Sequence, residues 1–390
     1  MSRDPVPIGR RVAYLRVRRR LSQQSFADRL GKSKSWVDKV ERGVRSLERV
    51  STIRDIAAVL RVDASALLGR DVQPDGVAEH REGVARIRAA LSAYEMAFGR
   101  PTDREVMSPD RLAREVRHAW MTFQHARYPR LVELLTALVS EVHRAHTQDP
   151  VAARAAVVEA YRVTAALLVK LDEGSLAWLA ADRAMSAAAG DPVLLACAAV
   201  QLGQVLRASA RAGPVMLAAA SQVAPGTPEE LSLCGSLLVQ AALIAARAGD
   251  DRAVGKLLDE AAELAARVGE GHDHYRTAFG PTAVELARVT ADVELGDGPQ
   301  AVAQHETAIG RDGWRWLPVE HRAAHLIDAA RAYLQTDDPA NAARVLLRAE
   351  RIAPAEIRDR PAARDVVAQV ARDPDAPPRI TKLAIGLGVL

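Results

Sequence analysis

Hydrophobic positions in the first 70 residues recur at steps of three and four, with short polar turns between the runs. This spacing places one apolar stripe along each of a series of short helices. Ser22 and Ser33 each precede such a run where an N-cap is expected, and Gly31 stands between the two runs, where a tight turn is needed. The pattern therefore predicts five short helices: over about 8–20, after Ser22, after Ser33, over about 47–60 and over about 64–69.

The segment that follows, 71–80, is polar, contains one proline and one glycine, and is typical of a linker. A further helix is predicted from a single apolar seam with alternating steps of three and four: Val84, Ile87, Leu91, Tyr94 and Phe98. The seam has two interpretations, docking on the C-terminal part of the chain or pairing with the same helix of a second copy. A polar break at 99–110 ends this helix, and Ser108 with Pro109 starts the next.

From residue 110 onward the pattern is helix, short turn, helix. Turns are predicted about every 40 residues, near Asp172, Gly213, Asp250, Asp297 and Asp338. Proline or glycine follows the second helix of a pair at Pro192, Pro225, Gly269 and Pro354. A two-helix repeat of this length indicates an α-solenoid. The predicted fold is all-α: a five-helix helix-turn-helix domain over 1–72, a linker with one amphipathic helix over 73–109, and a solenoid over 110–390.

Composition and charge divide the chain in the same way. Apolar residues make up 49% of the sequence and aromatic residues only 4%, which favours close-packed helices over β-sandwiches. Residues 1–50 carry a net charge of +9, whereas the remaining 340 residues carry −5. Either the basic N-terminal region binds a polyanion, or its charges form a solvated face.

The two cysteines, Cys197 and Cys234, lie in apolar helical runs without metal-ligand spacing, so buried reduced thiols are expected. No run approaches 18 consecutive apolar residues, and the N-terminal 20 residues lack the apolar core of a signal peptide. A cytoplasmic, nucleoid-associated protein without membrane contact is therefore expected.

The segments LSQQSFADRLGKSKSWVDKVERG and IAAVLRVDASALLG resemble the Cro/phage-repressor type of helix-turn-helix, called the XRE family. The matching features are the Ser-Gln start of the second helix, Ala27, Leu30–Gly31 and the Glu-Arg-Gly at 41–43. In this fold the third helix enters the major groove of operator DNA. The resemblance implies DNA contact by Gln23, Gln24, Ser33, Lys34, Ser35, Trp36, Lys39, Arg42 and Arg45.

The chemistry of these residues fits that role. Lysine donates to guanine O6 and N7, and serine contacts either base type. Arg42 and Arg45 are expected at phosphates, which fix position without reading sequence. A further basic run, Arg16, Arg18, Arg19 and Arg20, ends the first predicted helix. Trp36 departs from the family pattern, and two roles remain open: packing on the domain surface, or apolar contact with a thymine methyl or a sugar edge.

The repeated segments of the C-terminal region resemble tetratricopeptide repeats, with longer spacing and fewer aromatic positions than the standard unit. Stretches such as HAWMTFQHARYPRLVELLTALVSEV and YRVTAALLVKLDEGSLAWLAADRAM also resemble a large actinobacterial group of regulators with an N-terminal XRE domain. More distantly, the layout is similar to that of peptide-pheromone receptors of Gram-positive bacteria. These resemblances imply a regulator whose solenoid binds an effector.

Residues that could contact such an effector cluster in two loops. The predicted ligand residues are Tyr275, Arg276 and Phe279 in GEGHDHYRTAFGP, and Trp314 and Trp316 in GWRWLP. Each set has a structural alternative, a helix-connecting loop or a hydrophobic plug at a repeat junction. His321 and His325 lie one helical turn apart, but a metal site needs three or four ligands, so no metal is expected.

No dinucleotide, phosphate-loop, zinc-protease or nucleophile-elbow motif occurs in the chain, so neither an enzymatic role nor a cofactor is expected. The sequence predicts a sequence-specific transcriptional regulator, acting as a homodimer on double-stranded operator DNA. Its solenoid would sense a small molecule, a peptide or a protein. The alternative is a DNA-tethered interaction scaffold without a small-molecule effector.

Overall fold

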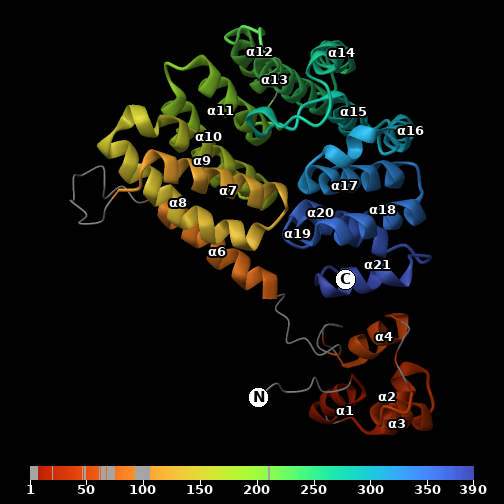
Figure 1. Cartoon of the computed structure of the whole chain (residues 1–390). Coiled ribbons are helices and arrows are strands. Elements are labelled where there is room, and N and C mark those ends of the chain that lie inside the picture. The colour runs from red at the N-terminus through yellow and green to blue at the C-terminus, as the bar shows by residue number, and fades with distance from the viewer. Residues whose placement is uncertain are drawn as a thin grey trace. The chain divides into compact units, whose positions relative to one another are not determined.

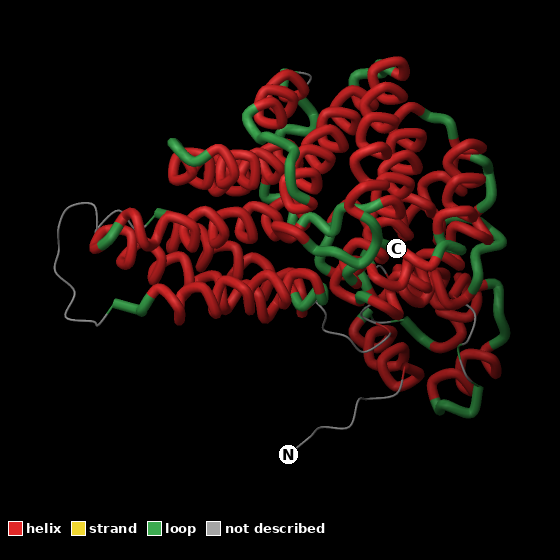
Figure 2. Tube along the Cα trace, turned by 45° about the horizontal axis from the view of Figure 1, so that its top comes forward, coloured by secondary structure: helices red, strands yellow, loops and turns green. Residues whose placement is uncertain are grey.

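A computed structural model describes residues 8–19, 21–45, 47, 50–60, 62, 67, 75–92, 106–209 and 211–390. Every regular element in these ranges is a helix, and they contain no strand (Figure 2). The predicted all-α fold is therefore confirmed. The chain forms two compact units, residues 1–79 together with 367–390, and residues 80–366.

The first unit contains short helices packed around one apolar core. Those that form the core are α1 (Ile8–Arg18), α2 (Gln23–Leu30), α3 (Lys34–Glu41) and α4 (Val50–Leu60), and α21 (Pro378–Gly386) contacts α4. The side-chain oxygens of Ser22 and Ser33 cap α2 and α3, and Gly31 between them has a left-handed backbone with φ of 62°. Val12, Phe26, Val37, Ile56 and Leu60 form the core of the unit. The predicted helix-turn-helix geometry follows from these caps and this buried face.

Three predicted boundaries differ from the structure or cannot be compared with it. The fourth helix begins at Val50, so Leu47 lies before it rather than inside it. Of the predicted fifth helix only Leu67 is described, and it is buried in the core. The segment 71–80 was predicted as a linker, but α6 (Asp75–Leu91) already begins within it. A polar stretch can extend a helix that is stabilised by burial of its downstream apolar residues.

The second unit consists of antiparallel helix pairs, which confirms the predicted helical-repeat architecture. Its helices are α7 (Pro109–Gln124), α8 (Tyr128–Gln148), α9 (Pro150–Lys170), α10 (Gly174–Ala188), α11 (Pro192–Val205), α12 (Ala212–Ser221), α13 (Pro228–Arg247), α14 (Asp251–Val268), α15 (Pro281–Leu295), α16 (Gly298–Ala308), α17 (Val319–Gln335), α18 (Pro339–Ile352) and α19 (Pro354–Arg358). Two short 3₁₀ helices, η2 (His274–Arg276) and η3 (Asp312–Trp316), interrupt the loops, and α20 (Pro361–Ala371) follows.

Most of the predicted turns coincide with helix caps. The side chains of Asp250, Asp297 and Asp338 cap α14, α16 and α18. Asp172 lies in the turn between α9 and α10 with φ of 60°. The turn predicted near Gly213 lies directly before it, at residues 206–208 and 211, and Gly213 itself is in the first turn of α12. A glycine is tolerated there at modest energetic cost, so it does not by itself mark a turn.

The odd-numbered helices form an inner row in the second unit. Each of α7, α9, α11, α13 and α15 contacts the next odd-numbered helix, and α17 also contacts α7, so the row returns toward its start (Figure 1). The pairing of Lys170 on α9 with Glu320 on α17 and with Glu356 on α19 joins the two ends of the row. This closure encloses a space that is lined by several inner helices.

The amphipathic seam of α6 is buried within the protein. Val84, Ile87 and Leu91 are all nearly inaccessible, and Arg183 Nη1 on α10 donates a hydrogen bond of 2.6 Å to the Leu91 carbonyl. This observation favours docking of the seam over pairing with a second copy. The other two seam residues, Tyr94 and Phe98, lie outside the described residues.

By length and hydropathy, α13 is apolar enough to cross a membrane, but 78% of its most apolar window is buried inside the protein. This burial identifies α13 as a core helix. Cys197 and Cys234 are both buried and free, as predicted, and burial raises the pKa of the Cys197 thiol to about 12.

Candidate nucleic-acid interface and central cavity

Helix α3 separates an exposed polar face from a buried apolar one. Lys34, Ser35 and Lys39 are exposed, whereas Val37 and Val40 on the opposite face are almost inaccessible. The separation follows from the helical period, since Val37 and Val40 are three residues apart. The structure thus brings three of the predicted DNA-contacting residues onto one accessible face.

Trp36 is half-buried and packs against the core of the first unit. Its backbone N–H donates to the Ser33 side chain at 3.1 Å, which is the N-cap bond of α3. The packing role proposed for Trp36 is therefore present in the structure. Contact with DNA through the accessible part of the ring remains a prediction.

The two predicted glutamines make hydrogen bonds inside the unit. Gln23 Nε2 donates to Glu41 Oε2 at 2.9 Å, and Gln24 Nε2 donates to Asp28 Oδ1 at 2.7 Å. Gln24 is exposed, whereas Gln23 is only partly accessible. Ser33 is exposed and uses its hydroxyl oxygen as the cap acceptor, which leaves its O–H free to donate.

Arg16 does not belong to the exposed basic run in which its sequence position places it. Its Nε and Nη2 donate to the two carboxylate oxygens of Glu41 at 2.6 and 2.9 Å, and its Nη1 donates to the Leu21 carbonyl at 2.7 Å. The side chains of Arg16 and Glu41 are only 12% and 6% exposed. This bidentate pair ties α1 to the end of α3, and hydrogen bonding to Glu41 raises the pKa of Arg16.

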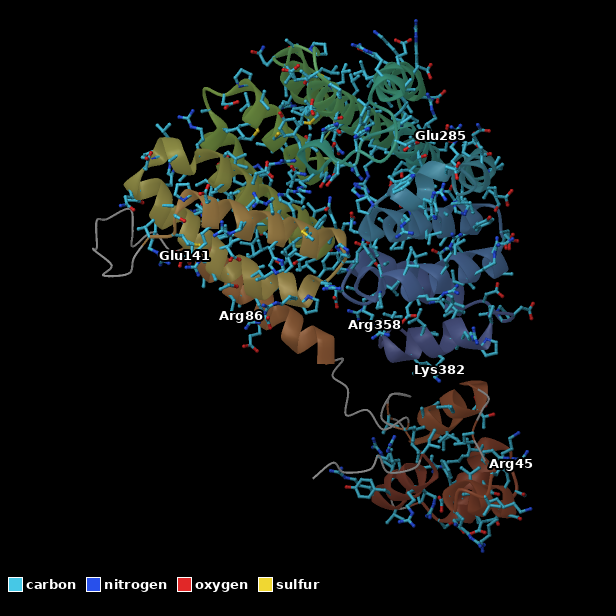
Figure 3. All side chains as sticks on the ribbon, viewed as in Figure 1. Arg45, Arg86, Glu141, Glu285, Arg358 and Lys382 are labelled. Carbon is cyan, nitrogen blue, oxygen red and sulfur yellow. The ribbon has the colours of Figure 1, made fainter. Side chains whose placement is uncertain are left out.

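The remaining basic residues of the first unit lie at its surface. Arg42 is exposed and makes a long ion pair of 3.5 Å with Asp38, and Arg45 lies exposed beyond the end of α3 (Figure 3). Arg18 and Arg19 are exposed, and Arg20 lies outside the described residues. Exposed cations therefore lie on α3, on the turn after it and at the end of α1, and others lie elsewhere in the unit: Arg10, Arg29, Lys32, Arg372, Arg379 and Lys382.

A cavity of about 270 Å³ lies inside the second unit, between the inner helices. Its walls come from α7, α9, α11, α13, α15, α17 and η2, so residues from 120 to 360 meet there. One side is apolar and includes Trp120, Phe123, Leu243 and Leu286. Such a combination of an apolar wall and a few polar groups is typical of ligand sites.

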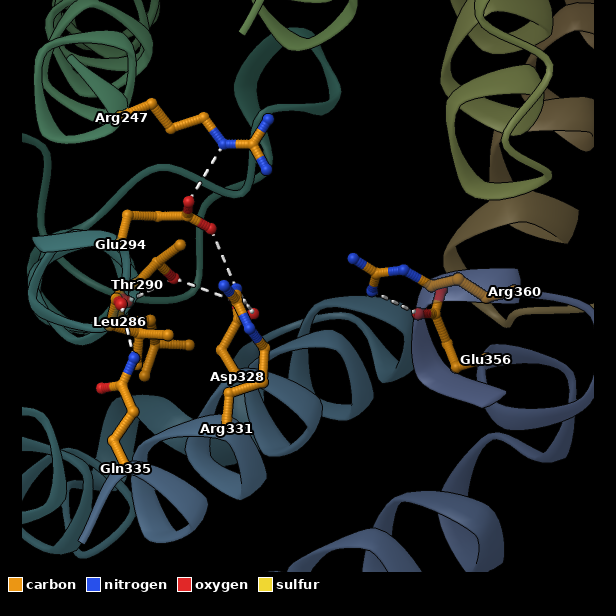
Figure 4. Close-up of polar contacts among 10 residues, drawn as sticks. Arg247, Leu286, Thr290, Glu294, Asp328, Arg331, Gln335, Glu356 and Arg360 are labelled. Carbon is orange, nitrogen blue, oxygen red and sulfur yellow. Dashed lines mark hydrogen bonds and ion pairs between the residues drawn. The ribbon is translucent and has the colours of Figure 1, made fainter. Parts of the chain in front are cut away.

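Most charged side chains around this cavity are neutralised by partners. On the cavity wall, Arg360 donates to Glu356 at 3.2 Å and Asp328 accepts from Arg331 at 3.4 Å; behind the wall, Arg331 and Arg247 also donate to Glu294 at 2.9 and 3.0 Å (Figure 4). On the same side of the unit, burial opposes ionisation of Glu320, but Lys170 and His321 hold the pKa of its carboxyl at about 2. These pairs keep the charges ionised and hold the inner helices together.

Arg207 is the exception among the described cations of the cavity wall. Its Nη2 donates to Gln240 Oε1 at 3.2 Å, and among the described residues no carboxylate lies within 4.0 Å of it. Its Nε is buried and has no acceptor. Burial lowers the pKa of this guanidinium, although arginine stays protonated at any physiological pH. No feature of the sequence singled out this residue.

The five predicted ligand residues separate in the structure. Arg276 and Phe279 line the central cavity, and Trp316, which is 64% exposed, lines a second cavity with Phe279. Tyr275 packs against the core between α11 and α13 and does not line the cavities described here, and Trp314 is buried with its ring edge against His325. Phe279 sits directly against Gly235, where a Cβ would lie 2.0 Å from the ring.

The loop that carries Arg276 and Phe279 is locally strained. Tyr275, Arg276 and Ala278 all have positive φ angles, between 48° and 61°. Such conformations are unfavourable for residues other than glycine and cluster at functional sites. Arg162 on α9 holds the loop, because its Nη2 donates to the Tyr275 carbonyl at 2.9 Å.

His325 is paired with a histidine other than the one that the sequence suggested. Its Nε2 lies 2.8 Å from His305 Nδ1, whereas His321 Nδ1 lies 3.3 Å from Glu320. Burial lowers the pKa of His305 to about 4 and that of His325 to about 3, so both are neutral. Within the described ranges no three His, Cys, Asp or Glu side chains converge as metal ligands would.

Comparison with known proteins supports the description of the first unit. Residues 7–68 match a family described as a helix-turn-helix domain. No curated protein matches the chain. Among solved structures, the crystal structure of Bacillus thuringiensis PlcR in complex with the peptide PapR7 and DNA aligns at 12% identity and a TM-score of 0.31 over 90% of this chain and 98% of that one. Residues 7–68, with the capped pair α2 and α3, therefore form a helix-turn-helix domain.

Proposed function

We propose that this protein is a transcriptional regulator that binds operator DNA through the exposed face of α3. The observation that supports it most directly is the polar face of Lys34, Ser35 and Lys39 within a helix-turn-helix domain. In such domains the second helix of the pair lies in the major groove. The exposed Arg42 and Arg45 would contact the flanking phosphates, which contribute affinity without sequence preference.

The regulator would act in the cytoplasm as a homodimer of the XRE type, because operators for such domains consist of two half-sites. The proposed role is binding rather than catalysis, without a metal or cofactor. The repeat unit, which we place among tetratricopeptide-like regulators of the actinobacterial type, would bind an effector in its central cavity. The effector would regulate DNA binding only if its affinity differs between the DNA-competent and DNA-incompetent states.

The test is capture of genomic fragments by the purified full-length chain, followed by competition of the recovered sites against random duplex. We expect a shared sequence element and a preference of at least a thousandfold at physiological salt. Equal binding to the recovered sites and to random duplex would contradict sequence-specific regulation. Recovery of one stoichiometric protein partner, with DNA affinity unaffected by small molecules, would instead support a DNA-tethered scaffold.

A further inference from the structure

The environment of Arg207 differs from that of every other described cation on the wall of the central cavity. Lys170 contacts Glu320 and Glu356, Arg360 contacts Glu356, and Arg276 contacts Asp273. Arg207 faces Gln240 alone. A guanidinium carries five N–H donors in a planar fork, so most of its hydrogen-bonding capacity is unused.

The nearby acidic residues do not compensate for this charge. Asp328 is the acidic group with the largest favourable effect on Arg207, but its carboxylate is already held by Thr290 Oγ1 at 3.1 Å and by Arg331 at 3.4 Å. Arg207 is partly buried, and its Nε is withdrawn from solvent without an acceptor, which is costly to stability. Its retention is explained most simply by an anion that enters the cavity.

The remaining wall residues indicate the chemistry of the uncharged part of the ligand. Aromatic rings of Trp120, Phe123 and Phe279 line the same cavity, and Val239 and Leu286 add aliphatic surface. The volume of about 270 Å³ is slightly below the usual range for ligand pockets, which is roughly 300 to 1,000 Å³. A small molecule with one charged end and an apolar body fits these dimensions, whereas a long peptide does not.

We propose that the central cavity binds a small amphipathic carboxylic acid, whose carboxylate pairs with Arg207 and whose apolar body lies against Trp120, Phe123 and Phe279. The assignment rests on the proposed role of the cavity as the effector site and names the chemical class of that effector. The fork of a guanidinium matches a carboxylate through two parallel hydrogen bonds. One unpaired cation balances one negative charge, so a dianionic phosphate would remain undercompensated in this wall.

The test measures binding to the full-length protein by calorimetry. The probes are octanoate and 4-phenylbutyrate, the corresponding uncharged amides, and inorganic phosphate. At least one acid is expected to bind at least tenfold more tightly than its amide, and phosphate is expected not to bind. Equal binding of acid and amide, binding of phosphate alone, or no binding of any probe would each overturn the proposal.

Substitution locates the interaction. Arg207→Gln should weaken binding of the acid at least tenfold and leave the amide unchanged, whereas Arg207→Lys, which keeps the charge but not the fork, should give an intermediate loss. Arg252→Gln, at an exposed position of α14, is the matched control and should bind as the unmodified protein does. Retention of acid binding by Arg207→Gln would overturn the assignment. If Arg207→Gln does not fold, the acid-to-amide ratio of the unmodified protein decides.

DNA binding of the same samples separates the two proposals. A protein that prefers its operator but binds none of the acids refutes the carboxylate site and leaves the regulator intact. A protein that binds an acid through Arg207 but shows no DNA preference supports the carboxylate site and refutes sequence-specific regulation.

Discussion

The two candidate sites hold their positive charges in opposite ways. On α3, Lys34 and Lys39 are exposed to solvent, where an unpaired charge is well hydrated. In the repeat unit, the charges around the cavity are paired with carboxylates, and Arg207 alone among the described wall cations lacks one. An unpaired cation at the surface is therefore weak evidence for a binding site, because such cations are common there. Inside the protein it is stronger evidence, because an unpaired charge there lowers stability.

The comparison also concerns how each site is built. The α3 face comes from one short helix, whose orientation is fixed by two serine caps and by the Arg16–Glu41 pair. The cavity comes from seven elements and depends on the contact between α7 and α17. Loss of a single ion pair should therefore perturb the α3 face more than it perturbs the central cavity.

The largest effect is expected for the ion pair that supports α3. Glu41→Ala removes the partner of Arg16 and of Gln23 and should lower the free energy of unfolding of the first unit by about 3 kcal/mol, because it strands a nearly buried guanidinium. Asp38→Ala removes only an exposed ion pair with Arg42 and should change the free energy of unfolding by less than about 0.5 kcal/mol. Urea unfolding measures both, and equal effects would show that the buried pair is not important for stability.

The next largest effect is a dependence on pH in the repeat unit. His305 and His325 are neutral when folded, with pKa values of about 4 and 3, but titrate near 6.5 when unfolded. Protons therefore bind the unfolded state preferentially between these values, and stability falls as the pH falls from about 6.5 toward 4.

The expected size of this effect is up to about 2 kcal/mol per histidine at pH 5. His325→Gln should have a flatter stability profile between pH 7 and pH 5 than the unmodified protein, whatever its absolute stability. Thermal unfolding across this range measures it. Parallel profiles would show that this pair does not contribute to the acid sensitivity.

Trp36→Ala distinguishes packing from readout on α3. Because the ring packs against the core of the first unit, the substitution should cost about 1 to 2 kcal/mol of stability. The sites recovered by the folded variant should stay the same as those of the unmodified protein. A variant with unchanged stability and relaxed site preference would instead assign the ring to DNA contact.

The smallest effect should have the opposite sign. Arg207→Met replaces an unpaired charge with an apolar chain and should raise the stability of the repeat unit by about 1 kcal/mol. Arg162→Met is the control, because Arg162 is fully buried and bonded to Gln201, Glu159 and the Tyr275 carbonyl, so its loss should destabilise the unit by several kcal/mol. Destabilisation by Arg207→Met comparable to that control would assign Arg207 a structural role.

The sequence pattern predicted the features that are determined by residues close together in the chain. The caps at Ser22 and Ser33 and the turns at Asp297 and Asp338 lie where the pattern placed them, because a helix N-terminus is determined by the few residues around it. The exposed side of α3 followed for the same reason, since Val37 and Val40 fix which face is buried.

Contacts between distant segments could not be predicted in this way. Arg16 was grouped with neighbouring arginines because its pairing with Glu41, 25 residues away, is absent from the local pattern. Arg207 stands in an ordinary alanine-rich run, and its isolation depends on which groups approach it from α13 and α17. Within the aromatic loops, the pattern indicated Arg276 and Phe279 but not that Tyr275 and Trp314 would turn into the core.

The most direct test of the central claim measures the operator dissociation constant at several salt concentrations for the unmodified protein and for Lys34→Ala/Lys39→Ala. The double variant should bind at least tenfold more weakly at about 150 mM salt, with a salt dependence reduced by about one to two released counterions. Lys256→Ala, at an exposed position of α14, should match the unmodified protein. An unchanged dissociation constant and salt dependence in the double variant would contradict DNA binding through the exposed face of α3.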